Sequence, residues 1–293
     1  MKISVVLSVF NESKFINDCL ISILEQSEVN VEVIVVDDYS TDNTWELVSE
    51  LKDGFPNLFL FKNPSKGKVH AFNYGVSIST GEYICLFGGD DIMPQNSLFE
   101  RYSAIRTYSS DQKVVGLSKI RILSTDKHLN GLIIPKRNNF ASYSGQSPLI
   151  SRCAAELLFP IPAHLVNEDT YIELVLRFAT NFIVIHSNII CCDWRRHQNN
   201  SVNISYGYKK YRDAICKRLV AYDVLLKNTV FELNKNILFL ESYNLYNHFR
   251  NGNYFQLLFS KGNFTDKLRY LSMSNKHFFY LRLIMGRLTM GFS

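Results

Sequence analysis

The sequence predicts an α/β fold in which a mostly parallel sheet is flanked by helices and followed by a C-terminal helical extension. Apolar runs typical of buried strands lie at residues 3–10, 31–36, 58–61 and 83–87. Stretches with apolar residues at helical spacing separate these runs, so strands and helices alternate along the chain. This alternation favours a parallel sheet, whose ligands bind beyond the carboxyl ends of the strands.

Each helix expected between these strands has a signal of its own. Apolar side chains share one face of a helix expected at residues 13–26, which Ser13 is placed to cap. The Ser, Thr and Asp side chains at residues 40–42 are suited to cap a helix at residues 43–51. A third helix is expected at residues 69–78 and ends before a glycine.

The following hundred residues predict further elements around a long polar loop at residues 135–148. A helix is expected to start at Pro94, because the first helical position needs no amide proton. Asn167-Glu168-Asp169 opens another helix, and acidic residues at a helix start suit the macrodipole. The remaining elements expected are strands at residues 114–123, 129–134, 182–185 and 189–193, and a short helix at residues 152–158.

Charge is distributed unevenly along the chain. Residues 1–205 hold 18 Lys and Arg residues against 22 Asp and Glu residues, whereas residues 206–293 hold 14 against 5. The second part is rich in aromatic residues and reads as helical, with helices expected at residues 208–226 and 237–249. A basic, aromatic tail indicates contact with an anionic membrane surface, and its apolar density disfavours nucleic acid as the partner.

The composition is that of a folded cytoplasmic protein. Of the 293 residues, 46% are hydrophobic and 13% are aromatic, which excludes a disordered chain. The first residues lead directly into a strand and lack the features of a signal peptide. Six scattered cysteines lie mostly in apolar runs and read as reduced core residues. Residues 278–292 are too short and too charged to span a bilayer of ~30 Å.

The stretch from Tyr83 to Pro94 is the strongest single candidate for a functional site. A buried strand leads into two glycines and then into Asp90 and Asp91. Carboxylates in such a loop suit Mg2+ or Mn2+, which prefer oxygen ligands. Two further polar clusters, Asn11-Glu12 and Asp37-Asp38, follow other strands and are expected at the same edge of the sheet.

Six segments, in the same order over residues 1–205, resemble the motifs of glycosyltransferase family 2. The resemblance is specific because the six occur together, and it does not extend to the tail. The segments are Phe10-Asn11-Glu12, Val35-Val36-Asp37-Asp38-Tyr39-Ser40-Thr41-Asp42, Gly67-Lys-Val-His-Ala-Phe-Asn73-Tyr-Gly75, Gly88-Gly-Asp90-Asp91, Asn167-Glu168-Asp169, and Arg195-Arg196-His197 followed by Asn200-Ser201.

The resemblance implies an inverting glycosyltransferase with the Rossmann-like GT-A fold. It implies a catalytic domain at residues 1–205, with a nucleotide-binding half at 1–110 and an acceptor-binding half at 111–205, and a helical C-terminal region at 206–293. Asp169 is expected to be the general base, because a protonated sugar hydroxyl is a poor nucleophile. Glu168 is expected to orient Asp169 or to bind the acceptor.

The resemblance also implies a nucleotide-sugar donor, and a divalent cation beside its diphosphate stabilises the leaving group. Asp38 can accept the imide proton of uracil, which indicates a UDP-linked donor, although guanine also offers donors. The residues expected to bind the donor are Phe10, Asn11, Glu12, Asp38, Lys68, Asn73, Asp90 and Arg196. The residues expected near Mn2+ or Mg2+ are Asp91 as first ligand, then Asp90 and His197.

One position departs from the family pattern. Gly88 stands where the family has the first aspartate of its D-x-D-D loop. If that aspartate were the sole metal anchor, metal dependence would be in doubt. We expect Asp91 to hold the ion instead.

The tail extends this hypothesis to a location and a set of partners. Aromatic and leucine-rich helices with interspersed Lys and Arg suit an anionic membrane surface, so the protein is expected peripherally on the inner face of the cytoplasmic membrane. The acceptor is then expected to be a saccharide on a lipid carrier such as undecaprenyl diphosphate, in O-antigen or capsule assembly. The alternatives are a helical cap packed on the catalytic domain and an oligomer interface.

Two other functions remain open on the sequence alone. A nucleotidyltransferase has a similar sheet but carries a Gly-rich basic loop after its first strand, where this chain has Asn11-Glu12-Ser13. A non-catalytic partner that binds sugar nucleotides is disfavoured by the presence of Asp38, Asp91 and Asp169. A dehydrogenase is disfavoured because no G-x-G-x-x-G follows the first strand.

Overall fold

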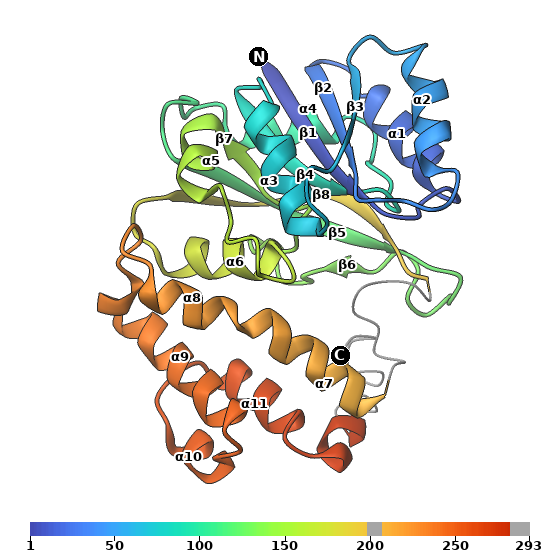
Figure 1. Cartoon of the computed structure of the whole chain (residues 1–293). Helices are drawn as coiled ribbons and strands as arrows, with labels where there is room; N and C mark the ends of the chain where they lie inside the picture. The colour runs from blue at the N-terminus through green and yellow to red at the C-terminus, as the bar shows by residue number, and fades with distance from the viewer. Residues whose placement is uncertain (198–206, 282–293) are drawn as a thin grey trace. The chain divides into compact units, whose positions relative to one another are not determined.

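The computed structural model describes residues 1–197 and 207–281 (Figure 1). Contacts divide the chain into a first unit, residues 1–173 with 181–196, and a second unit, residues 174–180 with the chain from 197 onward. The expected division into residues 1–205 and 206–293 stays a prediction.

The first unit is built on one sheet with the strand order β3-β2-β1-β4-β7-β5-β6, and β8 pairs with β5. In its first half β1 is parallel to β2 and β4, and β2 is parallel to β3, as the alternation of strands and helices predicts. The strands are β1 (Lys2–Val9), β2 (Asn30–Asp37), β3 (Leu58–Lys62), β4 (Tyr83–Gly88), β5 (Val114–Leu123), β6 (Ile133–Ile134), β7 (Leu149–Ser151) and β8 (Ile183–Arg195).

The second half of the sheet is mixed. The short strand β7 is antiparallel to both β4 and β5, while β8 runs parallel to β5. The two strands expected at residues 182–185 and 189–193 form the single strand β8. A register irregularity opposite Lys119 lets β8 stay paired along its length, so no break is needed between the two apolar runs.

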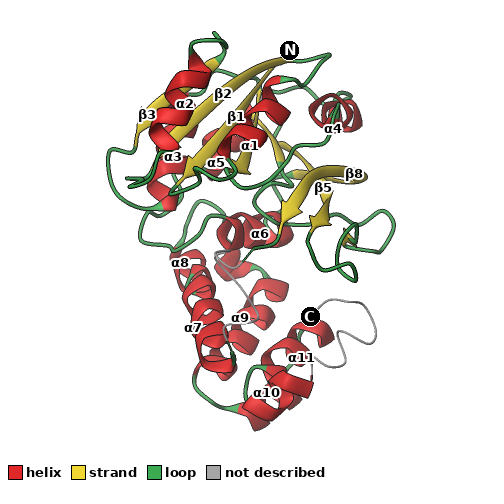
Figure 2. Ribbon diagram, turned by 90° about the vertical axis from the view of Figure 1, so that its right-hand side faces the viewer, coloured by secondary structure: helices red, strands yellow, loops and turns green. Residues whose placement is uncertain are grey.

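Helices cover both faces of the sheet (Figure 2). Val33 and Val35 of β2 belong to the core that contains α1, whereas Ile34 and Val36 pack with Ala71 of α3. This alternation follows from the two-residue repeat of a strand. The helices that begin in this unit are α1 (Ile16–Leu24), α2 (Thr44–Lys52), α3 (Lys68–Ile78), α4 (Ser97–Ile105), α5 (Arg152–Leu158) and α6 (Asp169–Phe178).

Two helix starts differ from expectation. Ser13 caps no helix, because α1 begins at Ile16 with Phe15 before it. The chain after Asp91 stays extended, since the Ile92 amide donates to the Asp193 carbonyl at 3.2 Å and the Asp193 amide donates to the Ile92 carbonyl at 2.8 Å. Helix α4 therefore begins three residues after Pro94, at Ser97.

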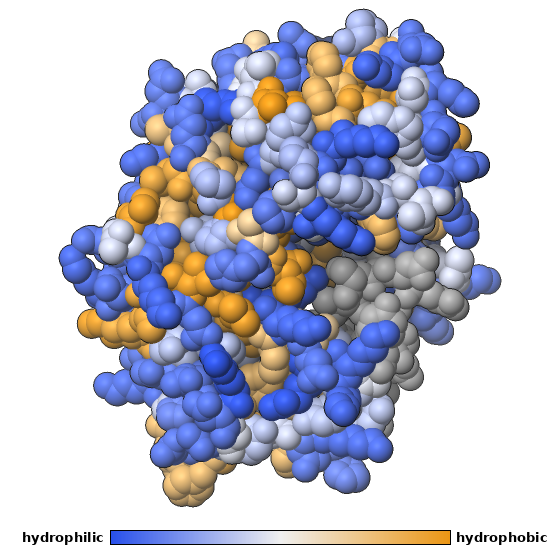
Figure 3. All heavy atoms as spheres, in the orientation of Figure 1, coloured by the Kyte–Doolittle hydropathy of each residue, from blue (hydrophilic) through white to orange (hydrophobic). Residues whose placement is uncertain are grey.

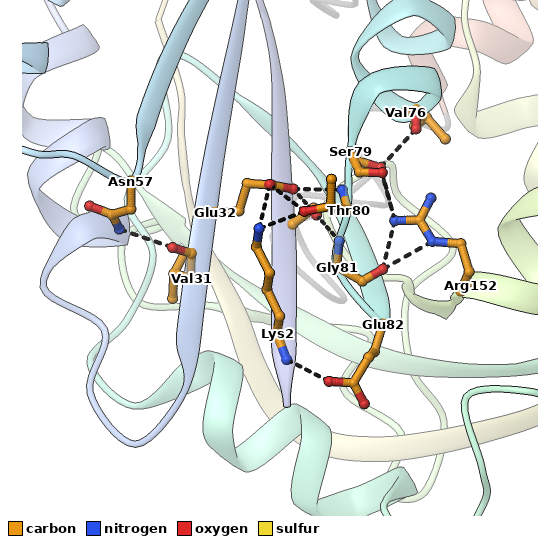
Figure 4. A network of polar contacts seen from close by, with 11 residues as sticks. Lys2, Val31, Glu32, Asn57, Val76, Ser79, Thr80, Gly81, Glu82 and Arg152 are labelled. Atoms are coloured by element: carbon orange, nitrogen blue, oxygen red, sulfur yellow. Dashed lines mark hydrogen bonds and ion pairs between the residues drawn. The ribbon is translucent and has the colours of Figure 1, made fainter.

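A polar network at the amino ends of the strands, opposite the ligand-binding edge, ties β1, β2 and the segment before β4 together (Figure 4). The carboxylate of Glu32 accepts hydrogen bonds from the Lys2 ammonium at 2.6 Å and from the Thr80 backbone amide at 2.8 Å. Burial alone would raise the pKa of Glu32, but these bonds and one from Ser4 lower it to about 2. Arg152 donates to the carbonyl of Gly81 at 2.6 Å, which joins α5 to the same segment.

The second unit is helical, as expected, and its aromatic residues form much of its core. The helix expected at residues 208–226 is divided at Val220. Tyr222 stacks on Tyr246 with ring centroids 5.4 Å apart, and Phe249 stacks on Tyr270 at 5.1 Å. Its elements are α7 (Tyr208–Leu219), α8 (Ala221–Lys227), a 3-10 turn (Leu233–Lys235), α9 (Ile237–Arg250), α10 (Tyr254–Phe259) and α11 (Phe264–Ser272).

Most of the segment expected at residues 278–292 lies outside the described residues. Within the described part of the chain, none of the helices is both long enough and apolar enough to cross a bilayer.

Candidate active site

The strand register brings the three polar clusters to one edge of the sheet. Val9 of β1 pairs with Asp37 of β2, and Ser8 pairs with Gly88 of β4, so the three strands end together. The loops that follow them carry Asn11-Glu12, Asp38 and Asp90-Asp91. This common edge confirms the placement that the sequence predicted.

The loops after β1 and β2 are joined by hydrogen bonds. The side-chain oxygen of Asn11 accepts from the Thr41 amide at 2.8 Å, and the Asn11 amide donates to the Ser40 hydroxyl at 3.0 Å. Asn11 and Tyr39 both adopt positive φ angles, of 56° and 64°. Asn11 therefore holds the shape of the rim, while Phe10 beside it is exposed.

Asp38 is buried and oriented by groups at the end of β3. Its Oδ1 accepts from the Gly67 amide and from the Asn63 side-chain amide, both at 2.7 Å. Within residues 1–197 and 207–281 no group bonds its other oxygen, Oδ2. Asp38 thus presents one carboxylate oxygen of fixed orientation. Asn63 was not expected in the site. It follows β3 directly, and this position at a strand end was the signal in the sequence that could have identified it.

Asp91 is an internal anchor of the loop after β4. Its side chain is 1% exposed. Oδ1 accepts from the Arg195 amide at 2.8 Å, and Oδ2 accepts from the Gln146 side chain at 2.7 Å. Burial, and then the neighbouring Asp90, raise the pKa of Asp91 to about 8. Both of its oxygens accept hydrogen bonds inside the protein, and Asp90 beside it is partly exposed, so the assignment of the cation to Asp91 or to Asp90 stays a prediction.

A side chain at position 88 would meet the two carboxylates that follow it. A Cβ on Gly88 would lie 2.8 Å from Oδ1 of Asp90 and 3.2 Å from Oδ2 of Asp91. A Cβ on Gly89 would lie 2.9 Å from Val9 and 3.2 Å from Glu12. An aspartate at position 88 would displace the Asp90 carboxylate, so the departure from the family pattern belongs to the packing of this loop.

The edge of the sheet concentrates negative charge. Burial, and then the neighbouring carboxylates of Asp90, Asp91 and Asp42, raise the pKa of Glu12 to about 8. In the described part of the chain no three His, Cys, Asp or Glu side chains form a ready metal centre. The donor set of Asp90 beside Glu12 fits a hard cation that takes its other ligands from a bound diphosphate and water.

Glu168 and Lys68 form an ion pair between the start of α6 and the start of α3. Their charged atoms are 2.8 Å apart, and Glu168 is 2% exposed while Lys68 is about half exposed. A Cβ on Gly145 would lie 2.9 Å from Oε1 of Glu168, so the 135–148 loop packs closely here. The Lys68 ammonium compensates this buried carboxylate, and its expected contact with phosphate stays a prediction.

Asp169, the expected base, is the first residue of α6. It is partly exposed, and its Oδ1 accepts from the Thr170 amide at 2.7 Å. Asn167 donates to the Thr170 hydroxyl at 2.9 Å, which adds a further bond within this turn. The contact of Glu168 with Lys68 joins this turn to the start of α3, and the role of Asp169 as general base stays a prediction.

Asn73 holds the segment that leads to this turn. Its side-chain amide donates to the Ile161 carbonyl at 2.7 Å, and its side-chain oxygen accepts from the Ile161 amide at 2.8 Å. Both ends of its side-chain amide are thus bonded inside the protein. The expected contact of Asn73 with the nucleotide sugar stays a prediction.

Gln146 and Arg101 support Asp91 and were not found in the sequence. The guanidinium of Arg101, which is 1% exposed, donates to the carbonyls of Gln146 at 3.2 Å and Ser147 at 3.0 Å. Arg101 lies between Leu98 and Ile105 on the buried face of α4, and a cation on an apolar face was the available signal. Gln146 lies in the loop at 135–148 and gave no signal.

At the end of β8 the residue in contact with the site is Arg195. Its Nε donates to the Asp90 carbonyl at 2.9 Å, and its guanidinium lies 4.7 Å from the ring centre of Phe15. The Arg196 amide donates to the Leu123 carbonyl at 2.9 Å, and its expected contact with the donor stays a prediction. His197 belongs to the second unit, and its expected place near the cation also stays a prediction.

Comparison with known proteins matches this unit to one family. The model of "Glycosyl transferase family 2" matches residues 4–155, which is just over half of the chain. Glycosyltransferase GlyG of Streptococcus pneumoniae is 34% identical over 110 residues, 37% of this chain and 36% of that protein. Poly(ribitol-phosphate) beta-glucosyltransferase of Bacillus spizizenii is 25% identical over 214 residues, 71% of this chain and 32% of that protein. The match thus spans about a third of the length of these relatives.

Solved structures show the same fold at low sequence identity. S. aureus TarS 1-349 in complex with UDP-GlcNAc has a TM-score of 0.61 and 18% identity, over 96% of this chain and 84% of that chain. The mannosyltransferase PcManGT from Pyrobaculum calidifontis, in complex with GDP-Man and Mn2+, has a TM-score of 0.60 and 16% identity, over 98% and 80%. The matched segment contains β1 to β4 and the polar edge that they form, and the chain therefore belongs to glycosyl transferase family 2.

Proposed function

We propose that the protein is an inverting glycosyltransferase that moves a sugar from a UDP-linked donor to a hydroxyl group of a saccharide. The observation that carries the proposal is the common edge of β1, β2 and β4, where an oriented Asp38 and a partly exposed Asp90 lie on one unit with Asp169. A nucleotide, a diphosphate and an attacking hydroxyl each have a group suited to them there.

Asp38 reads the base of the donor. Its Oδ1 is held by Gly67 and Asn63, which leaves Oδ2 to accept the imide proton of uracil. TarS, which shares the fold, has been solved with UDP and UDP-GlcNAc, and this supports a uridine donor. The structure of PcManGT with GDP-Man makes guanosine the alternative to exclude.

Asp90 would hold a divalent cation, Mn2+ or Mg2+, with Glu12 beside it. When bound, such an ion neutralises charge on the leaving diphosphate. Asp91 keeps the loop in place through Arg195 and Gln146 rather than by binding the ion. The structure of PcManGT, which shares the fold and was solved in complex with GDP-Man and Mn2+, supports the use of a divalent cation.

Asp169 accepts the proton of the acceptor hydroxyl as its oxygen attacks the anomeric carbon. The hydroxyl oxygen forms the new glycosidic bond, and the bond between the anomeric carbon and the diphosphate breaks with its electron pair on the phosphate. Attack opposite the leaving group inverts the anomeric configuration. Glu168, fixed by Lys68, holds the turn that carries Asp169.

The acceptor is a saccharide of bacterial polysaccharide assembly, carried on a lipid diphosphate at the inner face of the cytoplasmic membrane. The B. spizizenii relative is a poly(ribitol-phosphate) beta-glucosyltransferase, which supports a polymer-building role. The basic charge of the tail supports a peripheral position at the membrane.

A donor screen tests the proposal. The full chain is heated with Mn2+ and a panel of uridine, guanosine, cytidine and thymidine diphosphate sugars, and slow donor hydrolysis is measured in parallel. We expect a uridine donor to raise the melting temperature most, and Asp38→Asn to abolish the rise. Asp169→Asn should keep the rise and lose transfer. Stabilisation by guanosine donors alone, or by none of the panel, contradicts the proposal.

A further inference from the structure

Helices α10 and α11 of the second unit carry large apolar side chains that face solvent. Phe255, Phe259 and Phe264 are 74%, 75% and 71% exposed. Leu258 and Leu268 are at least half exposed. These five large apolar residues lie on two successive helices, and exposed apolar surface of this kind marks an interaction site. We call these five residues the α10–α11 surface, and pale orange atoms mark α10 at the lower end of Figure 3.

The exposed side chains stand on ordered helices. Phe255, Leu258 and Phe259 lie at helical spacing on one side of α10, while Leu257 between them is fully buried. The rings of Phe255 and Phe259 are 4.9 Å apart. The turn into α11 is capped, since the Asn263 side chain accepts from the Thr265 amide at 2.8 Å. The surface is therefore presented by the fold and is not a frayed end.

The charge around this surface is basic. From residue 250 to residue 281 the chain has five Lys or Arg residues and a single carboxylate, Asp266. That carboxylate lies 3.5 Å from the guanidinium of Arg177. Lys261 lies in the turn between α10 and α11, and Lys267 lies on α11 beside Leu268. Phe and Leu side chains interspersed with Lys are typical of a segment that lies in the interface of an anionic bilayer.

We propose that the α10–α11 surface docks the protein on an anionic membrane, with Phe255, Phe259 and Phe264 entering the interface and Lys261 and Lys267 facing the lipid phosphates. A second copy of the chain fits less well, because it would bring two basic surfaces together and because Lys is depleted from protein interface cores. This docking goes beyond the transfer reaction and would place the active unit beside a lipid-borne acceptor.

Vesicle binding tests the proposal with the full chain. The protein is sedimented with vesicles of phosphatidylcholine alone and of phosphatidylcholine with an equal part of phosphatidylglycerol. We expect binding to the anionic vesicles only, and weaker binding as salt is raised. Phe255→Ser/Phe259→Ser should weaken binding by about tenfold or more, since burying one aromatic ring alone supplies such a factor. Lys261→Glu/Lys267→Glu should weaken it on anionic vesicles.

A matched control is Phe59→Ser/Phe99→Ser, which removes two exposed phenylalanines from the first unit and should bind vesicles as the wild type does. Thermal stabilisation by the donor should be the same in all variants, so a failure of docking is distinguishable from a failure of the proposed reaction. Equal sedimentation with and without phosphatidylglycerol overturns the proposal, as does unchanged binding by Phe255→Ser/Phe259→Ser. The surface is assigned to a second copy of the chain instead if the wild type does not bind vesicles and forms a dimer that Phe255→Ser/Phe259→Ser dissociates.

Discussion

Replacing Lys68 by Met separates the role that the sequence suggested from the role that the structure gives. The substitution keeps the length of the side chain and removes the ammonium 2.8 Å from the buried carboxylate of Glu168. If Lys68 bound phosphate, the variant would bind donor weakly and fold normally. If Lys68 compensates Glu168, the variant loses stability and keeps its affinity for the donor.

The structure sets the size of this effect. Two unit charges at that distance attract by about 6 kcal/mol at an effective dielectric constant of 20. The half exposure of Lys68 reduces the net value, because exposed pairs contribute under ~1 kcal/mol while breaking a buried pair costs ~3–5 kcal/mol. We expect a loss of about 2 kcal/mol in the free energy of unfolding. For a unit of this size that lowers the melting temperature by about 4–8 °C.

The assay is urea unfolding followed by the fluorescence of Trp45 and Trp194, together with UDP titration in Mn2+. Lys66→Met is the matched control, because Lys66 is exposed just before α3 and pairs with no carboxylate among the residues that the structure describes. Lys68→Met/Glu168→Gln should be more stable than Lys68→Met, since the buried charge is then removed. If Lys68→Met keeps its stability and binds UDP tenfold more weakly, Lys68 does not compensate Glu168 and is a phosphate ligand.

Three further predictions follow from the fold and the site. Glu32→Gln should lower the free energy of unfolding at pH 7 by at most about 3 kcal/mol, because the pKa of Glu32 falls from 4.5 to about 2 on folding. This contribution to stability is present above pH 4.5 and is lost toward pH 2. The urea midpoints of the two proteins should therefore converge near pH 2. Gly88→Asp, which restores the family residue, should weaken Mn2+-dependent UDP binding at least about tenfold, because its Cβ would displace the Asp90 carboxylate. Calorimetry that finds tighter binding would contradict this prediction. Gln146→Ala should lower the free energy of unfolding by about 1–2 kcal/mol, and with it the melting temperature, since it removes the hydrogen-bond donor to one oxygen of buried Asp91. An unchanged melting temperature would contradict the role given to that bond.

The sequence predicts the half of the sheet formed by β1 to β4, because strands and helices alternate there along the chain. The strands β1 to β4 are joined by helices of ordinary length, and their right-handed parallel connection follows from that alternation. The edge that carries Asp38 and Asp90 follows at once, because parallel strands end on the same side. The mixed half has no such rule. Its strand β7 is three residues long and inserts between β4 and β5, a pairing that only tertiary packing decides.

The candidate site divides in the same way. Asp38 and Asp90 stand directly after strands and could be found from position alone. The engagement of both Asp91 oxygens inside the protein could not, because it depends on Gln146, 55 residues away, and on the Arg195 amide, 104 residues away. Likewise, nothing near Lys68 in the sequence indicates that its partner is Glu168. Long-range partners of this kind are selected by the folded backbone and leave no periodic pattern.

Calorimetric titration of UDP in the presence of Mn2+ tests the central claim, that the edge of β1, β2 and β4 binds a uridine diphosphate and that Asp169 acts afterwards. We expect Mn2+-dependent binding by the wild type, at least about tenfold weaker binding by Asp38→Asn through loss of its bond to uracil, and unchanged binding by Asp169→Asn. Absence of binding by the wild type, or equal binding by Asp38→Asn, would contradict it.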